Sequence, residues 1–393
     1  MSDLAINGGI PVRDTYLDYG KQSISGCDIE EVIKVLKSGY LTTGPMVAKF
    51  ENEVAKYVGC KYAVAVTNGT AALHIAMLAS NIKEGDEVLV TPMTFAASVN
   101  CILYCGGTPV FIDIEKDTGN IDVSKIEEKI TSKTKAIIAV DFAGHAVDID
   151  SIMKIAKKHN LIVVEDAAHA LGSEYNGIKV GNKADMTTFS FHPVKPITTG
   201  EGGMVVTNSE ELYKKLSLYR THGITRDSGI LENQEEEAFY YEQQSLGYNY
   251  RIPDINCALG ISQLTKIDYF IKKRRSIVEK YNELLKEFDC IETPIEKDYS
   301  KSGYHIYVIK LKLDKIKKSR NQIFKELRAE NIGVNVHYIP VYYHPYYKDL
   351  GYKKGLCENT EEFYEKIITL PLYPKMKKKD IEDVITALRK ILK

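Results

Sequence analysis

The sequence predicts an α/β protein in which helices cover both faces of a mostly parallel sheet. Short runs of β-branched and other apolar residues, typical of strands, alternate along the chain with longer amphipathic or alanine-rich segments, typical of helices. This alternation is typical of parallel strands joined by crossover helices. The predicted strands of this sheet are 62–66, a run within 83–92, 109–114, 135–141, 161–164, 186–191 and 204–207.

Length and composition fit one large and one smaller domain. At about 100–200 residues per domain, 393 residues predict two or three domains, or one large α/β domain with an appendage. The basic segment 266–288 predicts a long helix that links the sheet to a C-terminal part. We therefore expect an N-terminal arm over residues 1–25, a large domain over 26–265, and a linking helix with a small C-terminal domain over 266–393. The C-terminal elements that we predict are strands 305–311 and 333–338 and helices 322–331 and 380–392.

Composition argues against several classes of protein. The formal net charge is −1 with both signs interspersed, so no basic surface for nucleic acid is predicted. The apolar runs are far too short to span a membrane, and the first residues lack the pattern of a secretory signal peptide. Seven cysteines without a C-x-x-C pair predict free thiols and no metal site. We therefore expect a cytoplasmic protein that binds neither nucleic acid nor membrane.

The segment 185–208, D-M-T-T-F-S-F-H-P-V-K-P-I-T-T-G-E-G-G-M-V-V-T-N, presents a single lysine between two predicted strands. Pro193 and Pro196 restrict the backbone on either side of Lys195, so we expect a stiff, extended connection. A lysine that is held rigidly and partly desolvated has a lowered pKa and can attack a carbonyl carbon. Most lysines lie in solvent instead, but the rigid flanks favour the nucleophile here.

The predicted strand 62–66 runs into T-N-G-T-A-A-L-H-I-A, a glycine turn followed by an alanine-rich helix. The free N–H groups at a helix N-terminus and the positive end of the helix dipole attract anions. An ordinary connection between a strand and a helix has the same pattern. The presence of the lysine segment favours the anion site.

The buried strand 161–164 is followed by E-D-A-A-H-A-L-G, which brings two acids and a histidine to its carboxyl end. Open α/β sheets bind their ligands at this end of the strands. Asp166 is the candidate for ligand contact, and Glu165 should point the other way because side chains alternate along a strand. The alternative for Asp166 is the cap of a following helix, a position that aspartate favours.

The run F-S-F-H-P-V-K-P-I-T-T-G-E-G-G resembles the signature of the DegT/StrS-type sugar-nucleotide aminotransferases. The resemblance extends from L-A-I-N-G-G near the N-terminus to the final helix. It implies fold type I of the enzymes that depend on pyridoxal phosphate (PLP), with a seven-stranded sheet in the large domain and a smaller C-terminal α/β domain. It also implies that Lys195 is the catalytic residue, which forms the Schiff base with PLP, and that pyridoxamine phosphate is the aminated form of the cofactor.

The same resemblance implies further contacts with the cofactor. The turn after strand 62–66 holds the phosphate, Phe95 stacks on the pyridine ring, and Asp166 keeps the pyridine nitrogen protonated. His169 falls near the ring and its phenolic oxygen, where many family members have glutamine. From the residues alone, Phe95 could equally be a core side chain. The full set of implied cofactor-binding residues is Gly69, Thr70, Ala71, Phe95, Asp166, His169, Ser190, Lys195 and Asn249.

The segments Y-Y-E-Q-Q-S-L-G-Y-N-Y-R and V-N-V-H-Y-I-P-V-Y-Y also resemble the family. They imply a homodimer with shared active sites, in which Asn249 reaches the cofactor phosphate of the other subunit and Arg251 lies near that site. A structural ion pair is the alternative for Arg251, and a structural role is the alternative for His337. An acidic stretch at 231–237 is predicted to be mobile. The implied substrate-binding residues are Arg251, His337, Tyr241 and His192.

Two segments resemble the C4 aminotransferases of pseudaminic-acid biosynthesis: G-I-T-R-D with Y-Y-E-Q-Q-S-L-G-Y-N-Y-R, and V-H-Y-I-P-V with P-Y-Y-K-D-L-G-Y. This implies L-glutamate as the amino donor and UDP-2-acetamido-2,6-dideoxy-β-L-arabino-hex-4-ulose as the acceptor. One alternative is another keto-sugar nucleotide, aminated at C3 or C4. A relative that removes a hydroxyl would have histidine in place of Lys195. A regulator that keeps the fold without catalysis is opposed by the intact Lys195 and Asp166.

Overall fold

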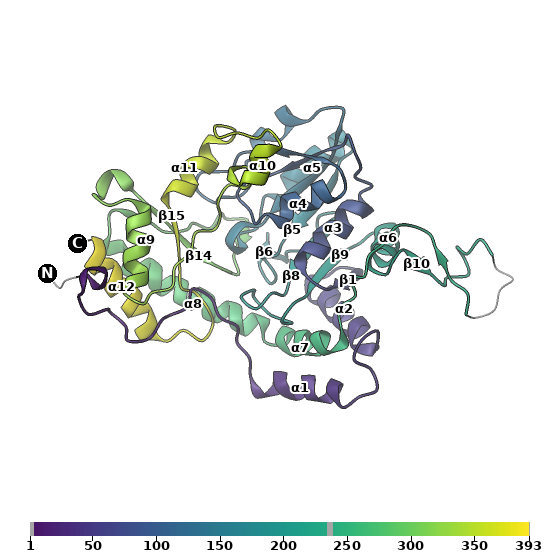
Figure 1. Cartoon of the computed structure of the whole chain (residues 1–393), viewed down its shortest axis with the longest axis horizontal. Helices are drawn as coiled ribbons and strands as arrows, with labels where there is room; N and C mark the ends of the chain where they lie inside the picture. The colour runs from purple at the N-terminus through teal and green to yellow at the C-terminus, as the bar shows by residue number, and fades with distance from the viewer. Residues whose placement is uncertain (1–3, 234–238, 393) are drawn as a thin grey trace.

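The computed structural model describes residues 4–233 and 239–392, and its centre is a seven-stranded sheet (Figure 1). Strand β9 pairs antiparallel with both of its neighbours, and the remaining pairs of this sheet are parallel. The predicted α/β class with a mostly parallel sheet is therefore confirmed. In spatial order the strands are β1 (Tyr62–Val66), β9 (Gly203–Thr207), β8 (Met186–Ser190), β5 (Ile162–Asp166), β4 (Thr134–Val140), β2 (Glu87–Val90) and β3 (Thr108–Phe111).

Side chains alternate between two buried layers on the two faces of this sheet. Ile137 and Val163 belong to one hydrophobic cluster, whereas their neighbours Ile138 and Val164 belong to the other. This is the period of two that a strand imposes, and both faces are apolar because helices cover both. The helices of this part of the chain are α1 (Gly26–Leu36), α2 (Pro45–Val58), α3 (Gly69–Ala79), α4 (Ala97–Tyr104), α5 (Ile149–His159), α6 (Glu210–Arg220) and α7 (Asp254–Leu264).

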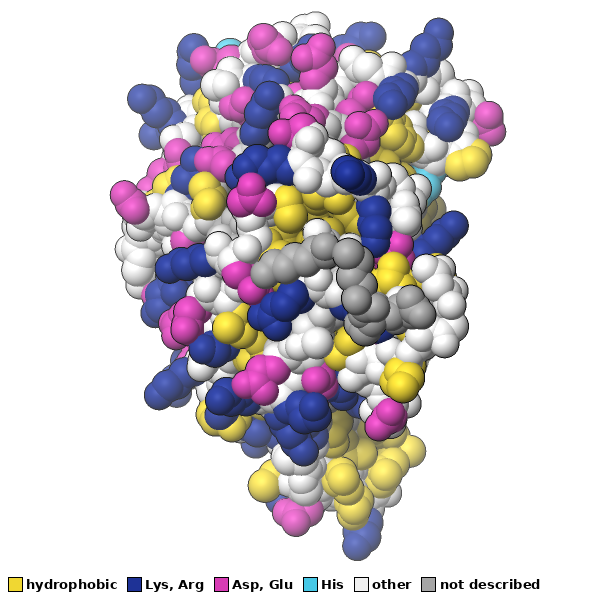
Figure 2. Space-filling view, turned by 90° about the vertical axis from the view of Figure 1, so that its left-hand side faces the viewer, with side chains coloured by type: hydrophobic (Ala, Val, Ile, Leu, Met, Phe, Trp, Pro, Cys, Tyr) yellow, Lys and Arg dark blue, Asp and Glu magenta, His cyan; other side chains and the backbone are white. Residues whose placement is uncertain are grey.

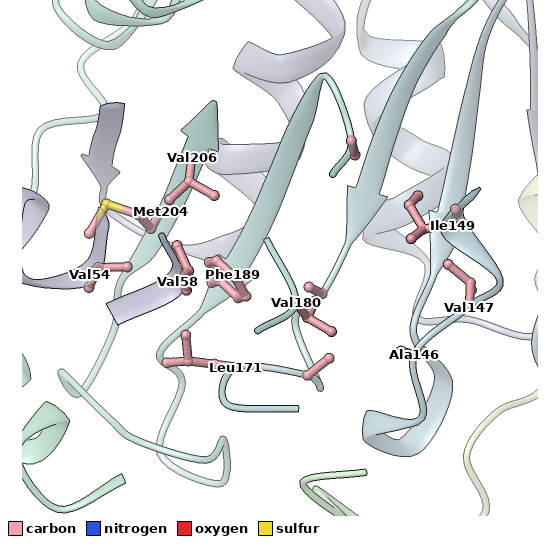
Figure 3. Packing of buried hydrophobic residues seen from close by; sticks show 14 of the residues in the cluster. Val54, Val58, Ala146, Val147, Ile149, Leu171, Val180, Phe189, Met204 and Val206 are labelled. Carbon is pink, nitrogen blue, oxygen red and sulfur yellow. The ribbon is translucent and has the colours of Figure 1, made fainter. Parts of the chain in front are cut away.

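One hydrophobic cluster packs α2 and α5 against the sheet. Figure 3 shows Val54 and Val58 of α2 beside Met204 and Val206 of β9 and Phe189 of β8. The opposite cluster takes its side chains from α3, α4, α6 and residues 341–357. The sheet is thereby buried on both faces, and only its strand ends remain available for a ligand.

Helix α8 (Ile267–Leu284) connects this sheet to a smaller three-stranded sheet (Figure 1). The smaller sheet has the order β12 (Ile291–Glu292), β14 (Tyr307–Leu311), β15 (Ile367–Leu370). Its cluster includes Tyr281, Tyr307 and Leu388 and also Leu17 of the N-terminal segment. The remaining helices of this part are α9 (Arg320–Ala329), α10 (Pro345–Asp349), α11 (Glu358–Lys366) and α12 (Lys378–Leu392).

A narrow arm projects from the body of the molecule between α6 and α7 (Figure 1). It contains the two-stranded ribbon β10 (Ile224–Thr225) and β11 (Glu242–Gln243). Most of the acidic stretch at 231–237, which we predicted to be mobile, lies outside the described residues. The other two-residue strands, β6 (Glu174–Tyr175), β7 (Ile178–Lys179) and β13 (Ser300–Lys301), form a small separate sheet.

Hydrophobic side chains are exposed on α1 and on the arm. The lower tip of the molecule in Figure 2, where Figure 1 places α1, carries a group of hydrophobic side chains beside charged ones. Ile29, Ile33 and Leu36 recur on one face of α1 and are at least 40% exposed, and Leu246 beside the arm is 76% exposed. Among the described residues, no helix combines the length and the apolar character needed to cross a lipid bilayer.

Two local predictions were wrong. Residues 333–338 do not form a strand, because Asn335 exchanges backbone hydrogen bonds only with Thr369 before the chain turns toward the large sheet. Lys195 lies in a turn rather than in an extended connection, since its N–H donates to the carbonyl oxygen of His192 at 2.9 Å.

Candidate active site

A cavity of about 650 Å³ lies at the carboxyl ends of β4, β5 and β8. This is the edge at which open α/β sheets bind ligands. The cavity is closed from the other side by residues 335–338, which follow α9, and by Tyr19 of the N-terminal segment. Both parts of the fold therefore contribute to one site.

Lys195 points into this cavity from the loop between β8 and β9. Burial lowers the pKa of its amine from 10.5 to about 8, while the negative charge of Asp166 opposes the change. Among the described residues, none forms a hydrogen bond or an ion pair with its Nζ. A large fraction of the amine is therefore uncharged near pH 8, as a nucleophile toward a carbonyl requires.

Asp166 ends β5 and is held on both carboxylate oxygens. The Ser98 hydroxyl donates to Oδ2 at 2.6 Å, and the Ala168 N–H donates to Oδ1 at 3.1 Å. Burial raises the pKa of Asp166, whereas these two hydrogen bonds and the charge of Lys195 lower it. No helix follows Asp166 within the described residues 167–173, so the alternative role as a helix cap does not apply.

The N-terminus of α3 opens onto the cavity, and Asn68 is its cap. The Asn68 side chain accepts the Ala71 N–H at 2.8 Å, so that N–H is not free for a ligand. Among the described residues, the N–H groups of Gly69 and Thr70 have no hydrogen-bond partner, so they remain available to a ligand. A Cβ on Gly69 would lie 2.9 Å from the Cβ of Ser190, so only glycine permits this approach. The result is a cradle suited to a small anion such as a phosphate group.

Three buried histidines surround the amine. The rings of His169 and His305 lie 4.4 Å apart between centroids, and His337 shares a 2.9 Å hydrogen bond between its Nδ1 and Oγ1 of Thr369. Burial and the positive charge of Lys195 lower the pKa of His337 to about 3 and hold the pKa values of the other two well below 6.5. All three rings are therefore neutral and can both donate and accept hydrogen bonds.

The structure brings most of the predicted site residues together. Phe95 presents a ring that is 62% exposed, which is unlike a core side chain. Among the described residues, Arg251 has no ion pair, so its alternative role is not observed. The predicted residues that line the cavity are Gly69, Thr70, Phe95, Asp166, His169, Ser190, His192, Lys195 and His337.

Four predicted residues do not line the cavity of their own chain. Ala71 is buried in α3 and engaged by its cap. Asn249 pairs with Thr221 through a backbone bridge near the base of the arm. Tyr241 lies on the arm with its ring 5.6 Å from the guanidinium carbon of Arg226. Arg251 and Asn249 thus stand outside the cavity of their own chain.

Several residues of the site were missed by the sequence analysis. The motif T-F-A-A-S, read only for its aromatic residue, also carries the serine that holds Asp166. Tyr338 follows His337 directly and was overlooked beside it. No local signal pointed to His305 or Tyr19, which reach the cavity only through the packing of the two parts of the fold.

Comparison with known proteins extends the likeness to the whole chain. Residues 22–389 match the model of the DegT/DnrJ/EryC1/StrS aminotransferase family. The chain is 42% identical over 383 residues to the UDP-4-amino-4,6-dideoxy-N-acetyl-beta-L-altrosamine transaminase of Campylobacter jejuni subsp. jejuni serotype O:23/36 (strain 81-176). That alignment covers 96% of this chain and 97% of the relative.

Solved structures show the same fold. Helicobacter pylori PseC, an aminotransferase involved in the biosynthesis of pseudoaminic acid, superimposes with a TM-score of 0.89 at 34% identity, over 96% of this chain and 99% of that one. The PLP form of the putative sugar aminotransferase Spr1654 from Streptococcus pneumoniae superimposes with a TM-score of 0.88 at 32% identity, over 96% and 100%. The predicted fold type, enzyme class and cofactor are thereby confirmed. Since the family model and these proteins each cover nearly the whole chain, the chain belongs to the DegT/DnrJ/EryC1/StrS aminotransferase family.

Proposed function

We propose that the cavity holds PLP and that Lys195 binds it covalently through Nζ. The observation that carries the proposal is the partly neutral amine of Lys195, which has no partner among the described residues and lines the same cavity as the carboxylate that Ser98 holds. The donor set fits the cofactor. The free N–H groups of Gly69 and Thr70 suit its phosphate, Asp166 suits its pyridine nitrogen, and the exposed ring of Phe95 can stack on it. When bound, PLP supplies an electron sink for a carbanion next to the amino group of the donor.

The residues of the chain then orient the reactants and move protons. With PLP bound and an amino donor in place of Lys195 on it, the freed amine of Lys195 would accept the proton from Cα of the donor and later release it as a general acid. Its lowered pKa suits both tasks, because general bases work best with a pKa near the working pH. Asp166 keeps its charge in place through two hydrogen bonds and stabilises a proton on its ligand. Because the histidines are neutral, they add no positive charge to those of Lys195 and the ligand.

We propose L-glutamate as the amino donor and the C4 ketone of UDP-2-acetamido-2,6-dideoxy-β-L-arabino-hex-4-ulose as the acceptor, in pseudaminic-acid biosynthesis. Support comes from the identity to the Campylobacter jejuni transaminase and from the likeness to PseC. His192 and His337 line the cavity and are candidates to contact the sugar nucleotide. Pyridoxamine phosphate is the form of the cofactor that carries the amino group between the two substrates.

We also propose a homodimer in which Asn249, Arg251 and Tyr241 serve the active site of the neighbouring subunit. These residues lie outside the cavity of their own chain, on or near an arm that projects from the body. The apolar faces exposed on α1 and beside the arm supply surface for association. The division into residues 1–25, 26–265 and 266–393 likewise remains a proposal. The contact of Leu17 with the C-terminal cluster suggests that the N-terminal segment packs with the small domain.

Transfer of labelled nitrogen tests the substrate assignment. The purified enzyme would be incubated with ¹⁵N-glutamate and a panel of UDP- and dTDP-linked keto-deoxysugars, and each product would be identified by mass spectrometry. We expect ¹⁵N in the product of the proposed UDP-sugar and none with Lys195→Ala. Label in a different sugar would replace the substrate but keep the aminotransferase. Loss of label from every sugar, with PLP bound, would favour a regulator that keeps the fold.

A further inference from the structure

Among the described residues that line the cavity, Tyr338 is the one whose side chain forms a hydrogen bond with the side chain of His169. The distance between its hydroxyl oxygen and Nε2 of His169 is 2.8 Å. The two rings lie nearly parallel, with an interplanar angle of 29°. The ring of Tyr338 also lies 6.2 Å from that of Phe95, so it stands beside the proposed place of the cofactor ring.

The direction of this hydrogen bond follows from the other ring nitrogen of His169. The backbone N–H of Ala143 donates to Nδ1 of His169 at 3.2 Å, so Nδ1 must be the acceptor. The low pKa of His169 keeps the ring neutral, with a single hydrogen. That hydrogen is therefore on Nε2 and is donated to the oxygen of Tyr338.

The backbone around Ala143 holds this arrangement in place. Ala143 has a φ of 59°, which is uncommon for a residue with a side chain and tends to mark functional sites. Its N–H meets His169, and its carbonyl oxygen accepts the N–H of His305 at 3.0 Å. The loop after β4 thus fixes the tautomer of His169 from a rigid position.

The hydroxyl hydrogen of Tyr338 is not used in its hydrogen bond with His169. His169 occupies one lone pair of the oxygen, and no described residue accepts the hydrogen. The charged or titratable groups around this pair are Asp166, Lys195, His305, His337 and Tyr19. Burial and the charge of Asp166 raise the pKa of Tyr338, so its hydroxyl stays protonated at working pH.

We propose that Tyr338 is a catalytic residue which donates its hydroxyl hydrogen to an acceptor oxygen of the ligand in the cavity, and that His169 is the positioning residue that aims it. The inference rests on the proposed function and changes one part of it. The family likeness implied only that His169 lies near the cofactor ring and its phenolic oxygen, whereas in this proposal Tyr338 makes the contact with the ligand oxygen. The acceptor is an anionic or carbonyl oxygen, either the phenolic oxygen of the cofactor or an oxygen of the substrate.

The test compares the loaded wild-type enzyme with Tyr338→Phe, and it follows the visible absorbance of bound PLP from pH 6 to 10 without substrate. Removing a donor from an anionic oxygen makes the ligand hold its own proton more tightly. If the acceptor is the cofactor oxygen, we expect the absorbance midpoint to rise by about one to two pH units, the size of one hydrogen bond to a charged group. If it is a substrate oxygen, the midpoint stays and KM rises or kcat falls about tenfold or more.

Variants of His169 separate positioning from folding. His169→Gln keeps a donor and an acceptor at the end of the side chain and should restore the wild-type midpoint or kinetics. His169→Leu should behave like Tyr338→Phe, and the double variant should be no worse than either single one, since the two residues act as one unit. Tyr343→Phe is a matched control, because Tyr343 lies in the same segment but not in the cavity wall.

The outcomes distinguish this inference from the proposed function. A wild-type chain that never develops the visible band of bound PLP would contradict the function and, with it, the role of Tyr338. A loaded wild type whose midpoint, KM and kcat are all unchanged in Tyr338→Phe would overturn the inference alone. Similar behaviour of His169→Gln and His169→Leu would overturn the positioning role of His169.

Discussion

Ser98 and Asp166 are joined by a hydrogen bond of 2.6 Å that links helix α4 to the end of strand β5. The hydroxyl of Thr94 lies 2.7 Å from that of Ser98 and extends the contact into a chain of three side chains. All three are buried. The carboxylate that we propose as the partner of the cofactor nitrogen is therefore held by groups of the protein itself, which is the preorganisation that electrostatic catalysis requires.

Asp166→Asn should abolish most of the activity without unfolding the protein. The amide keeps the shape, and the Ser98 hydroxyl can turn to accept from it while donating to Thr94. The amide cannot stabilise a positive charge on the ligand, so turnover should fall by about 10²-fold or more. Steady-state kinetics and PLP content would be measured together. Near-normal turnover would rule out the proposed role, and a variant that does not fold would point to a structural one.

Ser98→Ala should have a smaller effect than Asp166→Asn. It removes one donor to a charged group, which corresponds to about 1.5–3 kcal/mol and thus to roughly a 10- to 100-fold fall in kcat. Thr94→Val removes a hydroxyl one hydrogen bond further from the carboxylate, so the fall in kcat should be smaller still. The graded order of the three variants is the prediction. Equal losses in Ser98→Ala and Thr94→Val would contradict the graded order, and unchanged kcat in Thr94→Val would show that the chain of hydroxyls does not transmit the effect.

The rate at which apoenzyme takes up PLP should level off near pH 8. The neutral amine of Lys195 is the reactive form, and burial lowers its pKa to about 8. The rate should therefore rise with pH up to about 8 and then flatten, whereas the rate for an ordinary lysine would continue to rise up to about pH 10.5. Stopped-flow absorbance from pH 6.5 to 10 measures this. Because Asp166 raises the pKa of Lys195, Asp166→Asn should move the plateau to lower pH.

Stability should fall as pH rises toward neutrality because of Glu165. Burial raises its pKa from 4.5 to about 7, so the folded state keeps this proton to higher pH than the unfolded chain does. The contribution of Glu165 to the free energy of unfolding is fully present below about pH 4.5 and is lost as pH rises through about 7. Glu165→Gln should keep the contact with Thr187. Its free energy of unfolding, taken relative to that of wild type, should increase by about 1–3 kcal/mol from pH 5 to pH 8.

Urea unfolding at the two pH values would measure this gain. Glu53→Gln, at an exposed position of α2, is the control, and its free energy of unfolding should follow that of wild type at both pH values. An advantage of Glu165→Gln that is the same at pH 5 and pH 8 would mean that Glu165 does not carry the pH dependence.

Mixing two inactive variants should restore activity if the sites are shared between subunits. Lys195→Ala damages the cavity of its own chain, and Asn249→Ala damages the proposed contribution to the neighbour. In an exchanged heterodimer one site carries both lesions and the other carries neither. About half of the wild-type activity per heterodimer should return if the sites are independent. Exchange would be verified with a mass-tagged subunit, and exchange without recovery would refute the shared site.

The strands and the lysine signature were predictable because each depends on residues that are close together in the sequence. β1 has the predicted bounds, since apolar runs between turns define strands without reference to the rest of the chain. Asp166 and Lys195 were found for the same reason. Ser98 lies 68 positions from Asp166, and Tyr338 lies 169 positions from His169, so these contacts depend on how the parts of the fold pack. The false strand at 333–338 has the same origin, because its partner β15 meets it only at Thr369.

The most direct measurement is the location of the covalent bond to the cofactor. The purified enzyme would be loaded with PLP, reduced with borohydride and digested, and the peptides would be mapped by mass spectrometry. We predict a pyridoxyl adduct on Lys195, which has a partly neutral amine in the cavity, and no adduct in Lys195→Ala. An adduct on another lysine in the wild type, or an undiminished adduct in Lys195→Ala, would contradict the assignment of this cavity as the active site.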